Sequence, residues 1–178
     1  IHHYIAESPK SLIEKSKAKI EQMEKILPEF NALYGEAKTL PNARLYQGKG
    51  GMEIIVREYT NEAQKEILGF GSTDDYFEKL GDILPRYLKK RLARKIYSRL
   101  ILGDTPLSRE RMKLGQEHLR NARILPGIKQ EGEGMIVLWN DKIAMLSFHK
   151  EMVGLIIESS ILAKTMKTMF EVMWNHLK

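Results

Sequence analysis

Histidines are the first side chains to consider for chemistry, because imidazole serves as a metal ligand, a general base or a nucleophile. A helical zinc site needs two histidines four residues apart, and no pair in this sequence has that spacing. The sequence also contains no cysteine, which excludes disulfides, thiolate nucleophiles and cysteine-based zinc sites. We therefore expect neither a metal site nor a cofactor. The five histidines are His2, His3, His118, His149 and His176.

A glycine-rich segment, Gly48-Lys49-Gly50-Gly51, has some features of a phosphate-binding loop. That loop requires a glycine, four residues, then Gly-Lys followed by Ser or Thr. Here Ala43 stands at the first glycine position and Gly50 at the Ser/Thr position. We interpret the segment as a turn before a helix.

Basic residues are concentrated between positions 86 and 99 and contribute much of the net charge of +6. This basic segment 86–99 has two interpretations: a solvated helix face, which we prefer, or a surface for an anion or a nucleic acid. Aromatic residues are not interleaved as stacking on bases would require. The seven cations are Arg86, Lys89, Lys90, Arg91, Arg94, Lys95 and Arg99.

The N-terminal segment has the pattern of a long helix that pairs with another helix. Ser8-Pro9 is typical of a helix start, and Pro28 should kink the helix or restart it near Leu27. Apolar residues then recur at alternating steps of three and four, as in a coiled-coil seam. The helix could fold back on its own domain, but the narrow seam favours a homodimer. The predicted dimerisation residues are Ile13, Ile20, Met23, Leu27 and Phe30.

After a boundary at 35–41, short apolar runs alternate with amphipathic segments. We predict two parts, a linker and dimerisation helix over 1–40 and an effector domain over 41–178. Asn140-Asp141 is a two-residue hairpin signal. The pattern predicts an α/β fold with a mixed sheet flanked by helices. Strands are expected at 43–46, 66–70, 96–102, 121–125, 135–139, 142–148 and 153–158, and helices at 52–63, 74–95 with an interruption near Gly81 and Pro85, 107–118 and 161–177.

The ends of the predicted parallel strands carry the residues that could bind a ligand, because open α/β sheets bind ligands at the carboxyl ends of their strands. Ser72 and Thr73 precede a predicted helix start, where backbone N–H groups and the helix dipole favour an anion. The same residues would also serve as an N-cap without any ligand. The predicted residues for a small-molecule or anionic ligand are Tyr46, Ser72, Thr73, Arg99 and Asp104.

Several segments together resemble the TrmB-like family of transcriptional regulators, in an order and spacing that span nearly the whole chain. In that family a winged helix-turn-helix is followed by a linker helix and a phospholipase-D-like domain. The resemblance implies a homodimer that contacts DNA through an upstream winged helix not present in this chain, which begins at Ile1 rather than Met. The matching segments are HYIA at 3–6, LPEF at 27–30, NARLYQG at 42–48, KEILGFGS at 65–72, DKIAMLSF at 141–148, GLIIE at 154–158 and FEVMW at 170–174.

Phospholipase-D-type enzymes need His-x-Lys-x-x-x-x-Asp, in which the histidine attacks phosphorus and the lysine binds the phosphate. No histidine of this chain is followed by both partners. After His149, Glu151 and Ile156 occupy the required positions. Residues 132–140, where the motif should fall, contain neither His nor Lys. The sequence therefore predicts a domain without catalytic residues.

These observations favour a non-catalytic effector domain that sets the geometry of upstream DNA-binding heads in response to a small ligand. The first alternative is a stand-alone nucleic-acid-binding or protein-interaction module that uses the basic segment 86–99. The second is a degenerate hydrolase with a different site. No stretch approaches the roughly 18 apolar residues of a membrane helix, so we expect no membrane association and a cytoplasmic location.

Overall fold

A computed structural model describes residues 8–37, 41–71, 74–113, 115, 117–126, 134–148 and 152–177. The chain divides into two units, Ile1–Leu40 and Pro41–Lys178. Within the described parts of the chain, no helix is long and apolar enough to cross a membrane.

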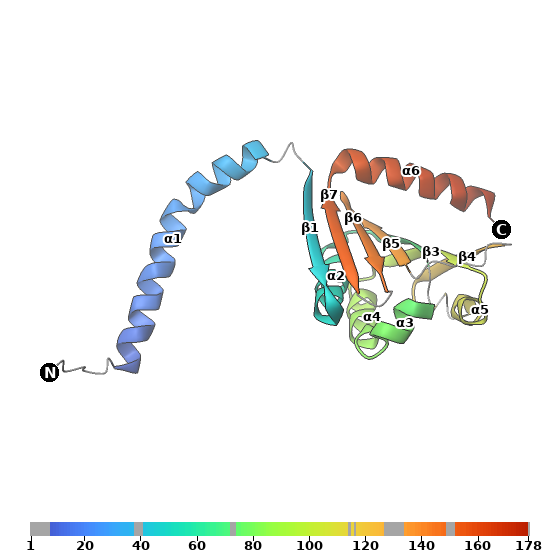
Figure 1. The fold of residues 1–178 in the computed structure, drawn as a ribbon, viewed down its shortest axis with the longest axis horizontal. Helices are drawn as coiled ribbons and strands as arrows, with labels where there is room; N and C mark the ends of the chain where they lie inside the picture. The colour runs from blue at the N-terminus through green and yellow to red at the C-terminus, as the bar shows by residue number, and fades with distance from the viewer. Residues whose placement is uncertain are drawn as a thin grey trace. The chain divides into compact units, whose positions relative to one another are not determined.

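The first unit contains one helix, α1 (Pro9–Ala37). Its start is confirmed, because the Ser11 N–H donates to the Ser8 Oγ at 3.2 Å, as an N-cap requires. Of the two effects expected of Pro28, the restart near Leu27 does not occur, since α1 continues through Pro28. Figure 1 shows the helix changing direction in its second half, which is the effect expected of a proline inside a helix.

The predicted dimerisation residues lie along α1. Ile13, Ile20, Met23 and Leu27 are all more than half exposed. Phe30 belongs to α1, but its side chain is not among those that the structure describes. Taken by itself, α1 thus carries an exposed apolar seam, and pairing of two such helices stays a prediction.

The second unit is a seven-stranded mixed sheet in the order β1-β7-β6-β5-β2-β3-β4. β2, β3 and β4 are parallel, and the remaining neighbours are antiparallel. The strands are β1 (Asn42–Gln47), β2 (Glu66–Gly71), β3 (Tyr97–Gly103), β4 (Arg120–Leu125), β5 (Gly134–Trp139), β6 (Lys142–Ser147) and β7 (Val153–Glu158).

Helices cover both faces of this sheet (Figure 1). One face packs against α2 (Gly48–Glu62), α3 (Asp74–Leu80), α4 (Leu84–Ala93) and α5 (Pro106–Lys113), and the other packs against α6 (Ser160–His176). Side chains alternate between the faces along each strand. On β2, for example, Ile67 joins the core under α2 and α4, and Leu68 joins the core under α6. The predicted α/β fold with a mixed sheet flanked by helices is confirmed.

One helix is shorter than its pattern indicated. The predicted helix over 107–118 ends at Lys113. The Gly115 N–H donates to the Met112 carbonyl at 3.1 Å, and the Arg120 N–H donates to the Gly115 carbonyl at 2.8 Å. These bonds close a turn between α5 and β4, and Gly115 lacks the Cβ that would lie 2.8 Å from the carbonyl oxygen of Arg120.

Candidate functional site

A cavity of about 290 Å³ lies between the sheet and the helices α2 to α5. Most of its wall is apolar. The sheet contributes side chains such as Ile67, Leu100 and Val137, and the helices contribute Val56 and Leu88. The polar side chains that reach the cavity are Tyr59, Thr60, Tyr76, Tyr87, Arg91, Ser98, Arg111 and Arg120.

Two tyrosines from different helices meet at this cavity. The hydroxyls of Tyr59 on α2 and Tyr76 on α3 hydrogen-bond to each other, and both side chains are buried. Burial raises the pKa of Tyr76 to about 12 and the pKa of Tyr59 well above its ordinary value, so both hydroxyls keep their protons. Two hydroxyls that share one hydrogen bond have one further proton to donate.

Arg91 on α4 is almost fully buried, with 6% of its surface exposed. Its guanidinium donates to the carbonyls of Ile96 and His118, each at 2.5 Å. The early end of α5 creates this contact, because it brings the carbonyl of His118 to Arg91. Burial lowers the pKa of Arg91 to about 10, and repulsion from Arg120 acts in the same direction. The carbonyls satisfy its N–H groups without neutralising its charge.

Arg120, the first residue of β4, has a buried Nε without a hydrogen-bond partner among the residues that the structure describes. Burial lowers the pKa of Arg120, and repulsion from Arg111 lowers it further. Arg111 on α5 stacks on Phe77, with its guanidinium carbon 3.7 Å from the ring centroid. Within the described residues, neither arginine forms an ion pair.

His118 lies beside these arginines, and its buried Nδ1 also lacks a partner among the described residues. Burial lowers the pKa of His118, and the positive charge of Arg120 is the next largest cause. The region around the cavity is therefore cationic and rich in hydrogen-bond donors.

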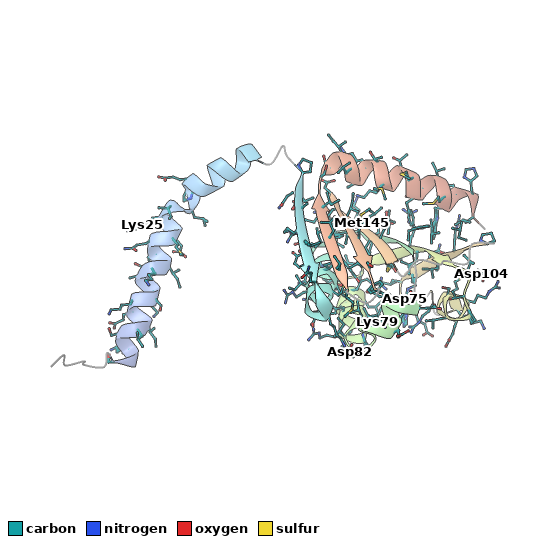
Figure 2. The ribbon with its side chains drawn as sticks, in the orientation of Figure 1. Lys25, Asp75, Lys79, Asp82, Asp104 and Met145 are labelled. Atoms are coloured by element: carbon teal, nitrogen blue, oxygen red, sulfur yellow. The ribbon has the colours of Figure 1, made fainter. Side chains whose placement is uncertain are left out.

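The structure separates the residues that the sequence predicted for a ligand site. Tyr46 lies on β1, where its hydroxyl accepts a hydrogen bond from Arg44 at 2.9 Å. Arg99 lies on β3, with β7, β6, β5 and β2 between the two strands. Asp104 follows β3 at the α5 end of the domain (Figure 2) and pairs with Arg109 at 2.7 Å. Ser72 and Thr73 lie outside the described residues.

Arg99 faces α6, on the side of the sheet opposite the cavity. Its guanidinium binds Glu66 at 2.9 Å and Glu171 at 2.5 Å, and it lies over the rings of Phe170 and Trp174. The bond to Glu171 is the main reason that the pKa of Arg99 is raised. Arg99 thus joins the sheet to α6, and its charge is already balanced within the fold.

The basic segment 86–99 does not form one solvated face. Arg91 is buried at the cavity, and Arg99 is paired on the opposite face. Arg94 donates to the carbonyls of Thr60 and Ala63 at the end of α2, at 2.5 and 3.2 Å. Arg94 is nevertheless exposed, as are Lys89, Lys90, Lys95 and Arg86, and Arg86 pairs with Glu53. Fewer cations are therefore available to a nucleic acid than the sequence indicated.

A second, more open hollow of about 540 Å³ lies at the carboxyl end of β2, next to Gly71. This is one of the strand ends where the sequence predicted a ligand. Its wall is apolar and includes Leu45, Phe70, Met145 and Leu155; Figure 2 labels Met145 on the sheet. Without charged or strongly polar side chains in its described wall, this hollow has little means of orienting a polar ligand.

No group of three or more potential metal ligands occurs among the residues that the structure describes. Sequence reasoning did not find the cavity residues Tyr59, Tyr76, Arg111 and Arg120. The alternation along 120–125 could have indicated that Arg120 points to one face of the sheet. No sequence signal placed α3, α4 and α5 over that face.

No protein-family model matches the sequence, and no curated protein matches it significantly. Solved structures are similar to it. TrmBL2, described as an archaeal chromatin protein with a novel mode of DNA binding, is 17% identical, with a TM-score of 0.55 over 95% of this chain and 64% of that chain. Nuc from Salmonella typhimurium, a phospholipase D family member, is 13% identical, with a TM-score of 0.58 over 78% of this chain and 97% of that chain.

NucT from Helicobacter pylori is also similar, at 12% identity and a TM-score of 0.56, over 78% of this chain and 98% of that chain. Identities this low establish the fold alone. The predicted phospholipase-D-like sheet is therefore confirmed. The chain spans 64% of the length of TrmBL2.

Proposed function

We propose that this chain is the dimerisation and effector part of a TrmB-like transcriptional regulator, and that it has no catalytic activity of its own. A small ligand in the cavity would favour one of two dimer geometries. The spacing of two DNA-binding heads supplied upstream would change with that geometry.

The extent of the similarity to TrmBL2 carries this proposal. A match over 95% of the 178 residues must include most of Ile1–Leu40 as well as the sheet domain. The match to Nuc covers 78% of the chain, about the share that Pro41–Lys178 alone makes up. The combination of a long helix and this sheet domain therefore has its counterpart in a protein described as binding DNA.

DNA-binding measurements at several salt concentrations test the proposal. The chain would be compared with a longer protein that includes the residues encoded upstream in its gene. We expect the longer protein to bind DNA as a dimer, with an affinity that falls steeply with salt, and the 178-residue chain to bind weakly. Equal affinity of both proteins would contradict the proposal and favour the exposed cations of the basic segment 86–99 as the DNA contact.

A further inference from the structure

The cavity under α2 to α5 is lined by positive charge that no described residue balances through an ion pair. Arg91, Arg111 and Arg120 all line it. None of the three takes part in an ion pair within the described part of the chain. Guanidinium groups keep their charge in proteins. Placing several of them close together at a buried site is costly unless an anion is present.

Several arginines elsewhere in the same domain have carboxylate partners. Arg44 binds Glu58 through two hydrogen bonds of 3.0 and 2.5 Å, and Arg99 binds two glutamates. Even Arg109, whose side chain is 66% exposed, pairs with Asp104. The fold thus provides acids for Arg44 and Arg99 on the two faces of the sheet, and Arg94 and Arg123 donate to backbone carbonyls. Among the described residues, the side chains of Arg111 and Arg120 have neither kind of hydrogen-bond partner.

The unsatisfied groups at the cavity are donors. The Nε of Arg120 has no partner among the described residues. Arg111 lies over the face of the Phe77 ring, and its N–H groups have no hydrogen-bond acceptor among the described residues. The Tyr59–Tyr76 pair has one proton to spare. A ligand that complements these groups must bring acceptor oxygens and negative charge.

Most of the remaining wall is apolar, and the volume of the cavity limits the size of the ligand. A cavity of about 150 Å³ is sufficient for benzene, so about 290 Å³ has room for a ring or a short chain with a head group. Inorganic phosphate alone would leave the apolar surfaces of Val56, Ile67 and Leu100 without contacts.

We propose that this cavity binds a small organic acid. Its carboxylate or phosphate head group lies against Arg111 and Arg120, and its apolar body lies between α4 and the sheet. That the domain senses this acid as a signal rests on the proposed function. The binding of the acid to the cavity does not depend on it.

Isothermal titration calorimetry of the 178-residue chain tests the proposal. The probes are benzoate and phenyl phosphate, with benzyl alcohol as the uncharged counterpart and inorganic phosphate as the head group alone. We expect at least one acid to bind at millimolar concentration or below, and benzyl alcohol and inorganic phosphate to bind at least about tenfold more weakly. The tighter of the two acids identifies the preferred head group.

Arg120→Gln and Arg111→Gln should each weaken binding of that acid by about tenfold to a hundredfold, because each removes a charge-assisted hydrogen bond. Arg109→Gln is the matched control, since Arg109 lies on the same helix as Arg111 and pairs with Asp104 at the surface. It should leave the affinity unchanged. If Arg120→Gln does not fold, as judged by circular dichroism, Arg111→Gln still decides the question.

Three outcomes would overturn the proposal: no acid binds, benzyl alcohol binds as tightly as the acids, or both arginine variants bind the acid as the wild type does. Equal affinity for inorganic phosphate and phenyl phosphate would contradict the proposal that the ligand has an apolar body. Because these titrations contain no DNA, they succeed or fail independently of the DNA-binding test. If an acid binds here but does not change the DNA affinity of the longer protein, the binding site stands and its sensory role is contradicted.

Discussion

Ser98 and Arg120 are register partners on the parallel strands β3 and β4, and both line the cavity under α2 to α5. Arg99, the neighbour of Ser98, points to the other face and binds Glu66 and Glu171. Two arginines on adjacent strands are therefore in opposite electrostatic situations. Arg99 is balanced by carboxylates, whereas Arg120 has no carboxylate partner among the described residues. This contrast leads to the first prediction.

Arg120→Met should leave the stability of the ligand-free chain unchanged or increase it, because it removes an unbalanced, partly buried charge. Arg99→Met should lower the free energy of unfolding by about 1–3 kcal/mol, because it removes charge-assisted hydrogen bonds to two glutamates. Urea unfolding at neutral pH measures both. A large loss of stability in Arg120→Met would show that the fold itself depends on this charge.

Tyr59 and Tyr76 should be strongly coupled. Each single change to phenylalanine leaves the other hydroxyl buried without its partner, at a cost of about 1–3 kcal/mol. The double variant removes both hydroxyls and should be less destabilised than the sum of the two single variants. A double-mutant cycle by urea unfolding gives the coupling energy, and additive effects would argue against the hydrogen bond.

The pKa of His118 should lie below 6.5 in the folded chain, since burial and then the charge of Arg120 disfavour its protonated form. Arg91 and Arg111 also repel the proton, whereas Glu117 attracts it. The unfolded chain then binds this proton more readily. The contribution of His118 to stability is present above about pH 6.5 and is lost as the pH falls through the lowered pKa.

Proton NMR titration of the His118 ring checks this pKa. An organic acid bound in the cavity should raise the pKa of His118 by offsetting the charge of Arg120. No movement of the pKa in the presence of a bound acid would place that acid away from the arginines.

The exposed seam on α1 should hold two chains together. Burying a side chain such as Ile20 or Leu27 stabilises a dimer by roughly 1.5–3 kcal/mol. The double variant Ile20→Asp, Leu27→Asp should therefore be monomeric by analytical ultracentrifugation. Changing two off-seam residues, Lys19→Asp with Lys25→Asp, is the control and should remain dimeric. A wild-type chain that sediments as a monomer at high concentration would refute the pairing.

The chain should not hydrolyse phosphodiesters, because no histidine is followed by the lysine and aspartate of the phospholipase-D motif. A chromogenic phosphodiester provides the assay. Any turnover by the wild type that is lost in His149→Ala would contradict this prediction. Turnover that persists in His149→Ala after extensive purification would point to a different site.

Local patterns in the sequence were sufficient to predict the elements. A short apolar run marked β7 at 153–158, and Asn140-Asp141 marked the β5–β6 hairpin, in which Asn140 adopts the positive φ of 46° that such turns require. These features depend on residues a few positions apart. The alternation of short apolar runs with amphipathic segments also indicated an α/β fold, because each amphipathic helix must bury one face against the sheet.

The sequence could not determine the candidate site, which depends on residues far apart along the chain. Alternation shows that Ser98 and Arg99 point to opposite faces of β3, but not which face lies under α2 to α5. Only the strand order, with β1 beside β7 and β2 beside β5, separates Tyr46 from Arg99. The same tertiary packing brings Arg91, Arg111 and Arg120 from three elements to one cavity, because side chains meet there through sheet pairing and helix packing rather than through their spacing in the sequence.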